Sequence, residues 1–236
     1  MTARAVGCEA VLFDLDDTLL DHRGAAKDAL RAWAVQAGLT MAADELATAW
    51  QLHERHYYDR YQRGELSKTQ QRRARVREIL RPVELSDEDA DGMFEAYWRL
   101  YRGAWRAFPD AEGAVRRAVH AGLRVGLLTN GDARDQRRKV EATFLAGFGL
   151  PMFASSELPG AKPDRRAFEF ACRALSVVPA RCLMVGDSLL NDIEGALNAG
   201  LPAVLLDRYG PARPAPEEYG LIRSLDELRF GGSVAV

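Results

Sequence analysis

Short apolar runs recur along the chain, and in its second half an amphipathic helical pattern separates each run from the next. Strands that alternate with helices of this size form right-handed β-α-β units around a parallel sheet. We therefore predict an α/β fold with a doubly wound parallel sheet. The predicted strands are 10–13, 125–128, 182–185, 203–206 and a weaker one at 152–154, and the predicted helices are 111–121, 133–145, 165–175, 192–199 and a short one at 224–230, before a frayed end.

The alternation is interrupted once, directly after the first predicted strand. Between about residues 20 and 108 the pattern is helical throughout, with stretches at 25–37, 43–62, 69–80 and 87–105 and no convincing strand. An insertion of this length is long enough to form a subdomain of its own. We therefore predict a Rossmann-like α/β core domain from residues 1–20 and 108–236, and an all-helical cap domain from residues 21–107.

Composition and charge exclude several classes of function. The chain has 236 residues, and its 32 basic and 34 acidic residues give a net charge of −2, which implies neither a nucleic-acid partner nor a membrane surface. No segment approaches the ~18 uninterrupted apolar residues that a membrane span needs. The three cysteines are widely spaced, and the N-terminus lacks the apolar core of a signal peptide. We expect a cytoplasmic protein, and the sequence leaves its oligomeric state unknown.

The first predicted strand ends in a cluster of acids, within the stretch VLFDLDDTLL. Asp14, Asp16 and Asp17 repel one another and resist burial unless something compensates their charge. Ligands of open α/β sheets bind beyond the carboxyl ends of the strands, so residues that follow the other strands should converge on the same crevice. Those residues are Thr129, Asn130 and Gly131, then Lys162, and then Gly186, Asp187, Ser188 and Asp192.

Together these residues are typical of a phosphate site. Asp14 and Asp187 are suited to bind Mg²⁺, which accepts one or two protein carboxylates together with waters and phosphate oxygens. Thr129 offers a hydroxyl, Asn130 offers a backbone N–H group, and Lys162 adds a positive charge. The metal ion would neutralise the acid cluster and let an anionic substrate approach. We therefore predict Mg²⁺ as the cofactor and a small phosphorylated molecule as the substrate.

The spacing of the first two acids suggests a mechanism. In an extended chain the side chains of Asp14 and Asp16 face the same side, roughly 6.6 Å apart along the strand. Phosphoryl transfer needs an attacking and a leaving oxygen on opposite sides of phosphorus. We expect Asp14 to attack and form an aspartyl-phosphate, and Asp16 to protonate the leaving alkoxide and then deprotonate water. Asp17 falls on the other face and is expected to cap the turn.

Four motifs now carry a family resemblance. The segments DLDDT at 14–18, LLTNG at 127–131, GAKPD around Lys162 and MVGDSLLND at 184–192 resemble, in order and spacing, those of the haloacid dehalogenase-like hydrolases. The insertion looks like the type 1 helical cap of that family. An acid at Asp16 favours the phosphatase branch over the dehalogenases, and the stretches around the second and third motifs are most similar to nucleotidase-like and N-acylneuraminate-9-phosphatase-like members.

The resemblance implies a role for each site residue. It makes Asp14 the nucleophile and Asp16 the general acid and base, and it places Asp14, the backbone carbonyl of Asp16, and Asp187 around the Mg²⁺ ion. The share of metal binding between Asp187 and Asp192 varies among relatives and stays open.

The resemblance also implies which residues bind the phosphoryl group and which residues support the site. Thr129 and Lys162 hold the phosphoryl oxygens. Thr18, within the first motif, and Asp192 support the site without touching the substrate, and Asp192 orients either Lys162 or a metal-bound water.

Two alternatives to a phosphatase stay open. A phosphotransferase or sugar-phosphate mutase would use the same carboxylates, although mutase relatives usually carry glycine where this chain has Asp17. Receiver domains of signalling proteins also hold an aspartyl-phosphate with acids, Thr, Lys and Mg²⁺, but chain length and the helical insertion argue against them. The favoured interpretation is a Mg²⁺-dependent phosphatase whose cap moves to exclude water and read the leaving group, with a substrate that the sequence does not reveal.

Overall fold

The computed structural model describes residues 4–5, 7–211, 214 and 216–231, and the end predicted to fray falls outside these residues from 232 onward. The chain divides into two compact units, one formed by Met1–Asp21 with Arg106–Val236 and the other by His22–Trp105. Each unit has a hydrophobic core of its own. The role of the helical unit as a cap stays a prediction.

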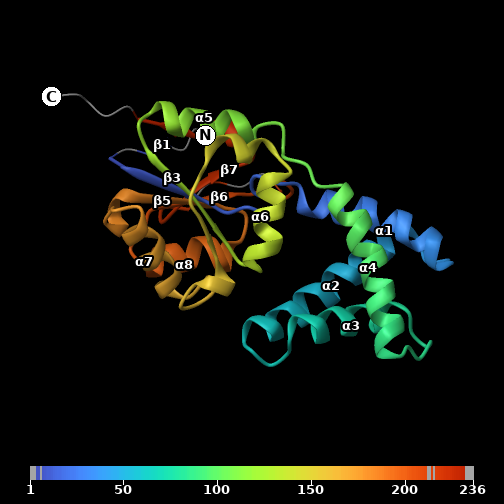
Figure 1. Ribbon diagram of the computed structural model, residues 1–236. Helices are drawn as coiled ribbons and strands as arrows, with labels where there is room; N and C mark the ends of the chain where they lie inside the picture. Colours follow the sequence, from blue (N-terminus) through green and yellow to red (C-terminus); the bar gives the residue numbers. More distant parts are fainter. Residues whose placement is uncertain (1–3, 6, 212–213, 215, 232–236) are drawn as a thin grey trace. The chain divides into compact units, whose positions relative to one another are not determined.

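The α/β unit is built on a parallel sheet (Figure 1). In the described part of the chain, six strands lie in the order β4-β3-β2-β5-β6-β7, and every neighbouring pair is parallel. The predicted α/β class and doubly wound parallel sheet are therefore confirmed. The strands are β2 (Ala10–Phe13), β3 (Arg124–Thr129), β4 (Met152–Ala154), β5 (Cys182–Gly186), β6 (Ala203–Leu206) and β7 (Gly220–Ile222).

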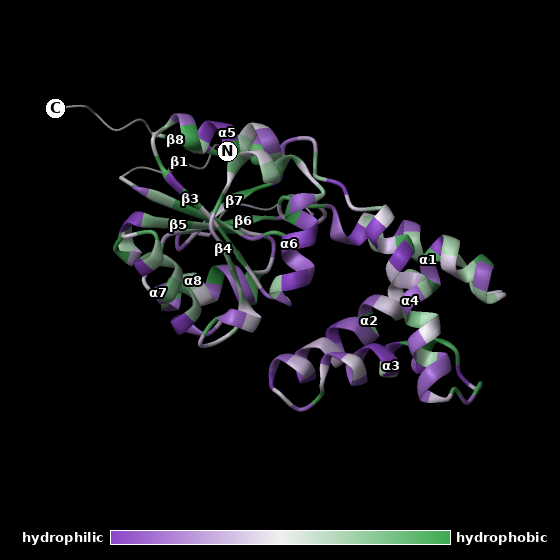
Figure 2. Cartoon of the chain, in the orientation of Figure 1, coloured by the Kyte–Doolittle hydropathy of each residue, from purple (hydrophilic) through white to green (hydrophobic). Residues whose placement is uncertain are grey.

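Helices cover both faces of this sheet. Along β2 the side chains alternate, so Val11 and Phe13 join the core on one face and Ala10 and Leu12 join the core on the other. All four are fully buried, and the apolar strands are visible in Figure 2 as the green centre of the unit. The first face carries α5 (Ala111–His120) and α6 (Ala133–Glu141), and the second carries α7 (Arg165–Ala174) and α8 (Gly195–Asn198).

Three predicted helices differ from the structure. The helix predicted at 133–145 ends at Glu141, and the chain continues as the 3₁₀ turn η1 (Phe144–Phe148), where two aromatic rings pack on the core. The helix predicted at 192–199 begins earlier, as the π-helical turn η4 (Leu189–Glu194) that precedes α8. The helix predicted at 224–230 is only a 3₁₀ turn, because the chain after it extends to form a strand. The turn is η5 (Leu225–Glu227), and the strand after it is β8 (Arg229–Phe230), which pairs in parallel with β1 (Arg4–Ala5) near the start of the chain. Two further 3₁₀ turns are η2 (Ser155–Glu157) and η3 (Pro179–Arg181).

The second unit consists of helices around an aromatic core. Trp33, Trp50 and Tyr97 are almost completely buried there, and the rings of Trp50 and Tyr97 lie 4.3 Å apart between centroids. Among the helices that the structure describes, none combines the length and the apolar character needed to cross a membrane. The helices of this unit are α1 (His22–Ala37), α2 (Ala43–Gln62), α3 (Lys68–Ile79) and α4 (Asp87–Gly103).

Candidate active site

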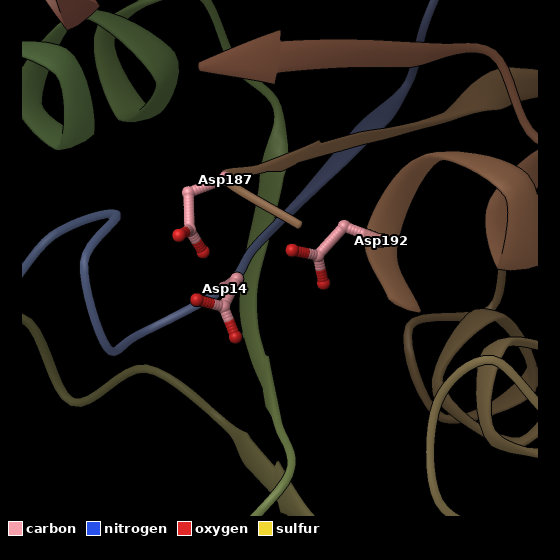
Figure 3. A group of neighbouring side chains, drawn as sticks. All are labelled: Asp14, Asp187 and Asp192. Carbon is pink, nitrogen blue, oxygen red and sulfur yellow. The ribbon is translucent and has the colours of Figure 1, made fainter. Parts of the chain in front are cut away.

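Three carboxylates meet at the carboxyl edge of the sheet. Asp14 follows β2 and Asp187 follows β5, and because these strands are parallel neighbours, both residues emerge at the same edge. The π-helical turn η4 brings Asp192 back to them. One oxygen from each side chain lies within 4.8 Å of the others, and Figure 3 shows the three side chains gathered at the strand ends. The strand-end residues of the first and fourth motifs therefore share one site.

Lys162 lies between two of these carboxylates. Its Nζ donates to Oδ1 of Asp14 at 2.7 Å, to Oδ1 of Asp192 at 2.5 Å and to the backbone carbonyl of Leu128 at 2.8 Å. An ammonium group has three protons, and three acceptors receive them. Burial alone would lower the pKa of Lys162, but the charges of Asp14 and Asp192 outweigh it and raise that pKa above its ordinary value. The lysine is thus a buried group whose charged form is favoured by the two carboxylates beside it.

The carboxyl group of Asp14 has an unusual affinity for its proton. Burial raises the pKa of Asp14 to about 7, Lys162 opposes that rise, and the charges of Asp192 and Asp16 add to it. Only 6% of the residue is exposed to solvent. The site therefore carries more negative charge than Lys162 alone can balance, which is a condition that a bound cation relieves.

The donor set fits a hard divalent cation. All three side chains of the cluster offer oxygen, the ligand that Mg²⁺ prefers, and none offers sulfur or imidazole. The two oxygens of Asp192 already accept hydrogen bonds from Lys162 and from the backbone N–H of Ser188, the latter at 3.0 Å. Asp192 therefore holds the lysine, and Asp14 and Asp187, which directly follow β2 and β5, are the carboxylates that could hold the ion at the strand ends.

Gly186 makes the position of Asp192 possible. A Cβ atom at Gly186 would lie 2.3 Å from Cγ of Asp192, which is far inside van der Waals contact. The glycine at the end of β5 therefore lets the buried carboxylate of η4 approach the strand closely enough to reach Lys162.

Asp16 faces a different set of partners. Its side chain is 26% exposed, and Nζ of Lys139 donates to both of its oxygens at 2.7 Å each. Nε2 of Gln136 donates to Oδ2 of Asp16 at 2.9 Å and to Oγ1 of Thr129 at 2.6 Å. Gln136 thus connects two predicted site residues, and neither Gln136 nor Lys139 is among the residues predicted from the sequence. The turn between Asp14 and Asp16 continues into Asp17, which adopts a positive φ of 63°.

The structure shows the surroundings of two further predicted residues, Asn130 and Thr18. The side chain of Asn130 is engaged by the backbone of Lys162, to whose carbonyl its Nδ2 donates at 2.7 Å and from whose N–H its Oδ1 accepts at 2.8 Å. It thereby ties the loop that carries the lysine to the end of β3. Thr18 is fully buried, and its hydroxyl has no hydrogen-bond partner in the described part of the chain. No hydrogen bond of that hydroxyl links it to the acid cluster.

A Rossmann-like sheet with a carboxylate cluster and a buried lysine at its carboxyl edge defines a class of α/β hydrolase. The chain belongs to the haloacid dehalogenase-like hydrolases, because the model of that family matches residues 8–200. This match confirms the resemblance carried by the four sequence motifs.

Individual relatives agree with this assignment. The chain is 30% identical over 232 residues to N-acylneuraminate-9-phosphatase of Mus musculus, covering 93% of this chain and 91% of the relative. It is 31% identical over 210 residues to glyceraldehyde 3-phosphate phosphatase of Methanothermobacter thermautotrophicus, covering 84% and 85% of the two chains. The magnesium-bound HAD-hydrolase YfnB from Bacillus subtilis has a similar fold, with a TM-score of 0.79 at 22% identity over 93% of this chain and 96% of that chain.

Proposed function

We propose that this protein is a Mg²⁺-dependent phosphatase that hydrolyses a small phosphomonoester through an aspartyl-phosphate intermediate. The observation that carries the proposal is the buried pair of Asp14 and Lys162 beside Asp187 and Asp192, at the edge of the sheet where ligands bind. The relatives described above are named as phosphatases, which supports phosphomonoesters as the substrate class. As part of the same proposal, the helical unit is the type 1 cap of the family.

Each residue has a defined task in this reaction. An oxygen of Asp14 attacks phosphorus while Lys162 fixes the carboxylate through Oδ1. The bond from phosphorus to the leaving oxygen breaks, and Asp16 gives that oxygen a proton. Thr129 donates its hydroxyl to a phosphoryl oxygen. Asp14 and Asp187 would hold Mg²⁺, which when bound supplies positive charge against the phosphoryl oxygens.

The second half of the reaction restores the enzyme. Asp16 takes a proton from a water molecule, whose oxygen attacks phosphorus and breaks its bond to Asp14. Inorganic phosphate leaves, and Asp14 is again a free carboxylate. In this scheme the same carboxyl group of Asp16 acts first as an acid and then as a base, so its orientation matters in both halves.

The proposal is tested by phosphate release from a panel of phosphate esters, with wild type and Asp14→Asn compared. We expect Asp14→Asn to lower turnover by at least about a thousandfold, which corresponds to ~4 kcal/mol of activation free energy. We also expect a chelator to remove the activity and added Mg²⁺ to restore it. Appearance of inorganic phosphate separates hydrolysis from phosphoryl transfer. Full activity of Asp14→Asn, or full activity in the chelator, refutes the proposal.

A further inference from the structure

Helix α6 turns a polar face toward the interior of the α/β unit. Its sequence is ARDQRRKVE, and its buried residues are Ala133, Gln136 and Lys139, which recur every three positions and therefore lie on one side. Figure 2 shows most of the helix in the hydrophilic colour. Glutamine and lysine are seldom buried unless they are paired, so this face is built for polar partners.

Those partners are two residues of the proposed reaction. Lys139 contacts the two oxygens of Asp16 symmetrically, at 2.7 Å each, and only 7% of the lysine side chain is exposed. Gln136 uses both hydrogens of its amide, one on Asp16 at 2.9 Å and one on Thr129 at 2.6 Å. Asp16 thus accepts hydrogen bonds from Gln136 and from Lys139, two buried residues of α6.

The orientation of the Gln136 amide follows from its neighbours. The reverse orientation would place its carbonyl oxygen against the carboxylate of Asp16, where two acceptors would repel. Because Oγ1 of Thr129 accepts from Gln136, the hydroxyl proton of Thr129 is left to point to another acceptor. Gly131 provides the space, since a Cβ atom there would lie 2.7 Å from Cγ of Gln136.

We propose that Gln136 and Lys139 are positioning residues that hold the carboxylate of Asp16 in the orientation of a proton acceptor and turn the hydroxyl proton of Thr129 toward the phosphoryl group. The inference rests on the proposed phosphatase function. The arrangement seen in the structure suits the second half of the reaction, in which Asp16 removes a proton from water. Lys139 acts on the reaction only through Asp16, and Gln136 acts through Asp16 and Thr129.

A double-mutant cycle tests the role of Lys139. Turnover of p-nitrophenyl phosphate is measured for wild type, Lys139→Met, Asp16→Asn and the double variant, because this leaving group needs no proton and keeps residual rates measurable. We expect Lys139→Met to lower kcat on the order of tenfold to a hundredfold, within the range that general acid–base catalysis contributes. In the Asp16→Asn background the same substitution should change kcat by less than twofold. An equal loss in both backgrounds overturns the inference.

The shape of the time course gives a second readout. If Lys139 serves the hydrolysis of the phosphoenzyme, Lys139→Met should release a burst of p-nitrophenol close to one equivalent per enzyme before a slow steady state. Lys139→Arg should restore part of kcat, because a guanidinium can donate to both oxygens. Arg134→Met is the matched control, since Arg134 is an exposed residue of the same helix, and its kcat should equal that of wild type. A burst-free Lys139→Met with the kcat of wild type counts against the inference.

Thermal unfolding of every variant separates positioning from loss of fold. Should Lys139→Met fail to fold, Gln136→Met takes its place in the cycle, and its effect on kcat should likewise shrink in the Asp16→Asn background. Turnover that survives Asp14→Asn would refute the proposed function itself. Turnover that depends on Asp14, combined with additive effects of Lys139 and Asp16, would refute only the positioning role.

Discussion

Asp14 should destabilise the metal-free protein at neutral pH, and Asp14→Asn should relieve that cost. Burial raises the pKa of Asp14 from an ordinary 3.8 to about 7 in the folded protein. Between these values the folded state keeps a proton that the unfolded state has lost, so stability falls as pH rises. Each pH unit is worth about 1.4 kcal/mol, so the interval from pH 5 to pH 7 removes about 3 kcal/mol from the wild type. Asparagine does not titrate, so the variant escapes this loss.

The assay is urea unfolding of wild type and Asp14→Asn at pH 5 and pH 8, with a chelator present throughout. We expect the stability of the variant relative to wild type to increase by about 3 kcal/mol between the two pH values. Excess Mg²⁺ should then stabilise the wild type at pH 8 and have little effect on Asp14→Asn, because binding to the folded state alone raises stability. A difference between the two proteins that is independent of pH would show that Asp14 is ionised throughout and refute the reasoning.

Three further predictions follow from the same site. Mg²⁺ affinity, measured by calorimetry, should weaken about tenfold per unit as pH falls below about 7, because the ion must displace the proton of Asp14. Gly186→Ala should lower the free energy of unfolding, measured in urea, by about 1–3 kcal/mol and should lower turnover, because the new Cβ would meet Asp192. The control is Gly92→Ala in α4, which has open space around it and should raise the free energy of unfolding by about 0.5–1 kcal/mol. Lys162→Met should lose about 3–5 kcal/mol of stability in urea at pH 8 and less at pH 5, since it leaves buried carboxylates without their cation. Unchanged unfolding midpoints in Gly186→Ala or Lys162→Met would contradict the packing described for them.

Much of the α/β unit was predictable because its strands are short, fully apolar runs. The predicted strands at 10–13, 152–154 and 203–206 match β2, β4 and β6 residue for residue. A parallel strand buried on both faces cannot tolerate polar residues, so the pattern stands out locally. The gathering of Asp14, Lys162 and Asp192 followed from the same rule, since residues after parallel strands meet at one edge.

The parts that were missed depend on contacts between distant segments. β7 (Gly220–Ile222) is a short edge strand that forms by pairing with β6, and nothing in its own sequence marks it. Gln136 and Lys139 lie in a helix so rich in charge that its pattern resembles a solvated surface. Their burial becomes evident only when Asp16, more than a hundred positions earlier in the chain, is seen opposite them.

All three N–H groups of the Lys162 ammonium are already engaged, which affects any anion that reaches the site. All three of its acceptors belong to the protein, so an incoming oxygen must share a proton with one of them or displace it. We expect a neutral ester to gain little from such an exchange and a doubly charged ester to bring enough attraction to compete. We therefore expect the resting hydrogen bonds of Lys162 to select ligands by charge, before any part of the substrate beyond its anionic group is recognised.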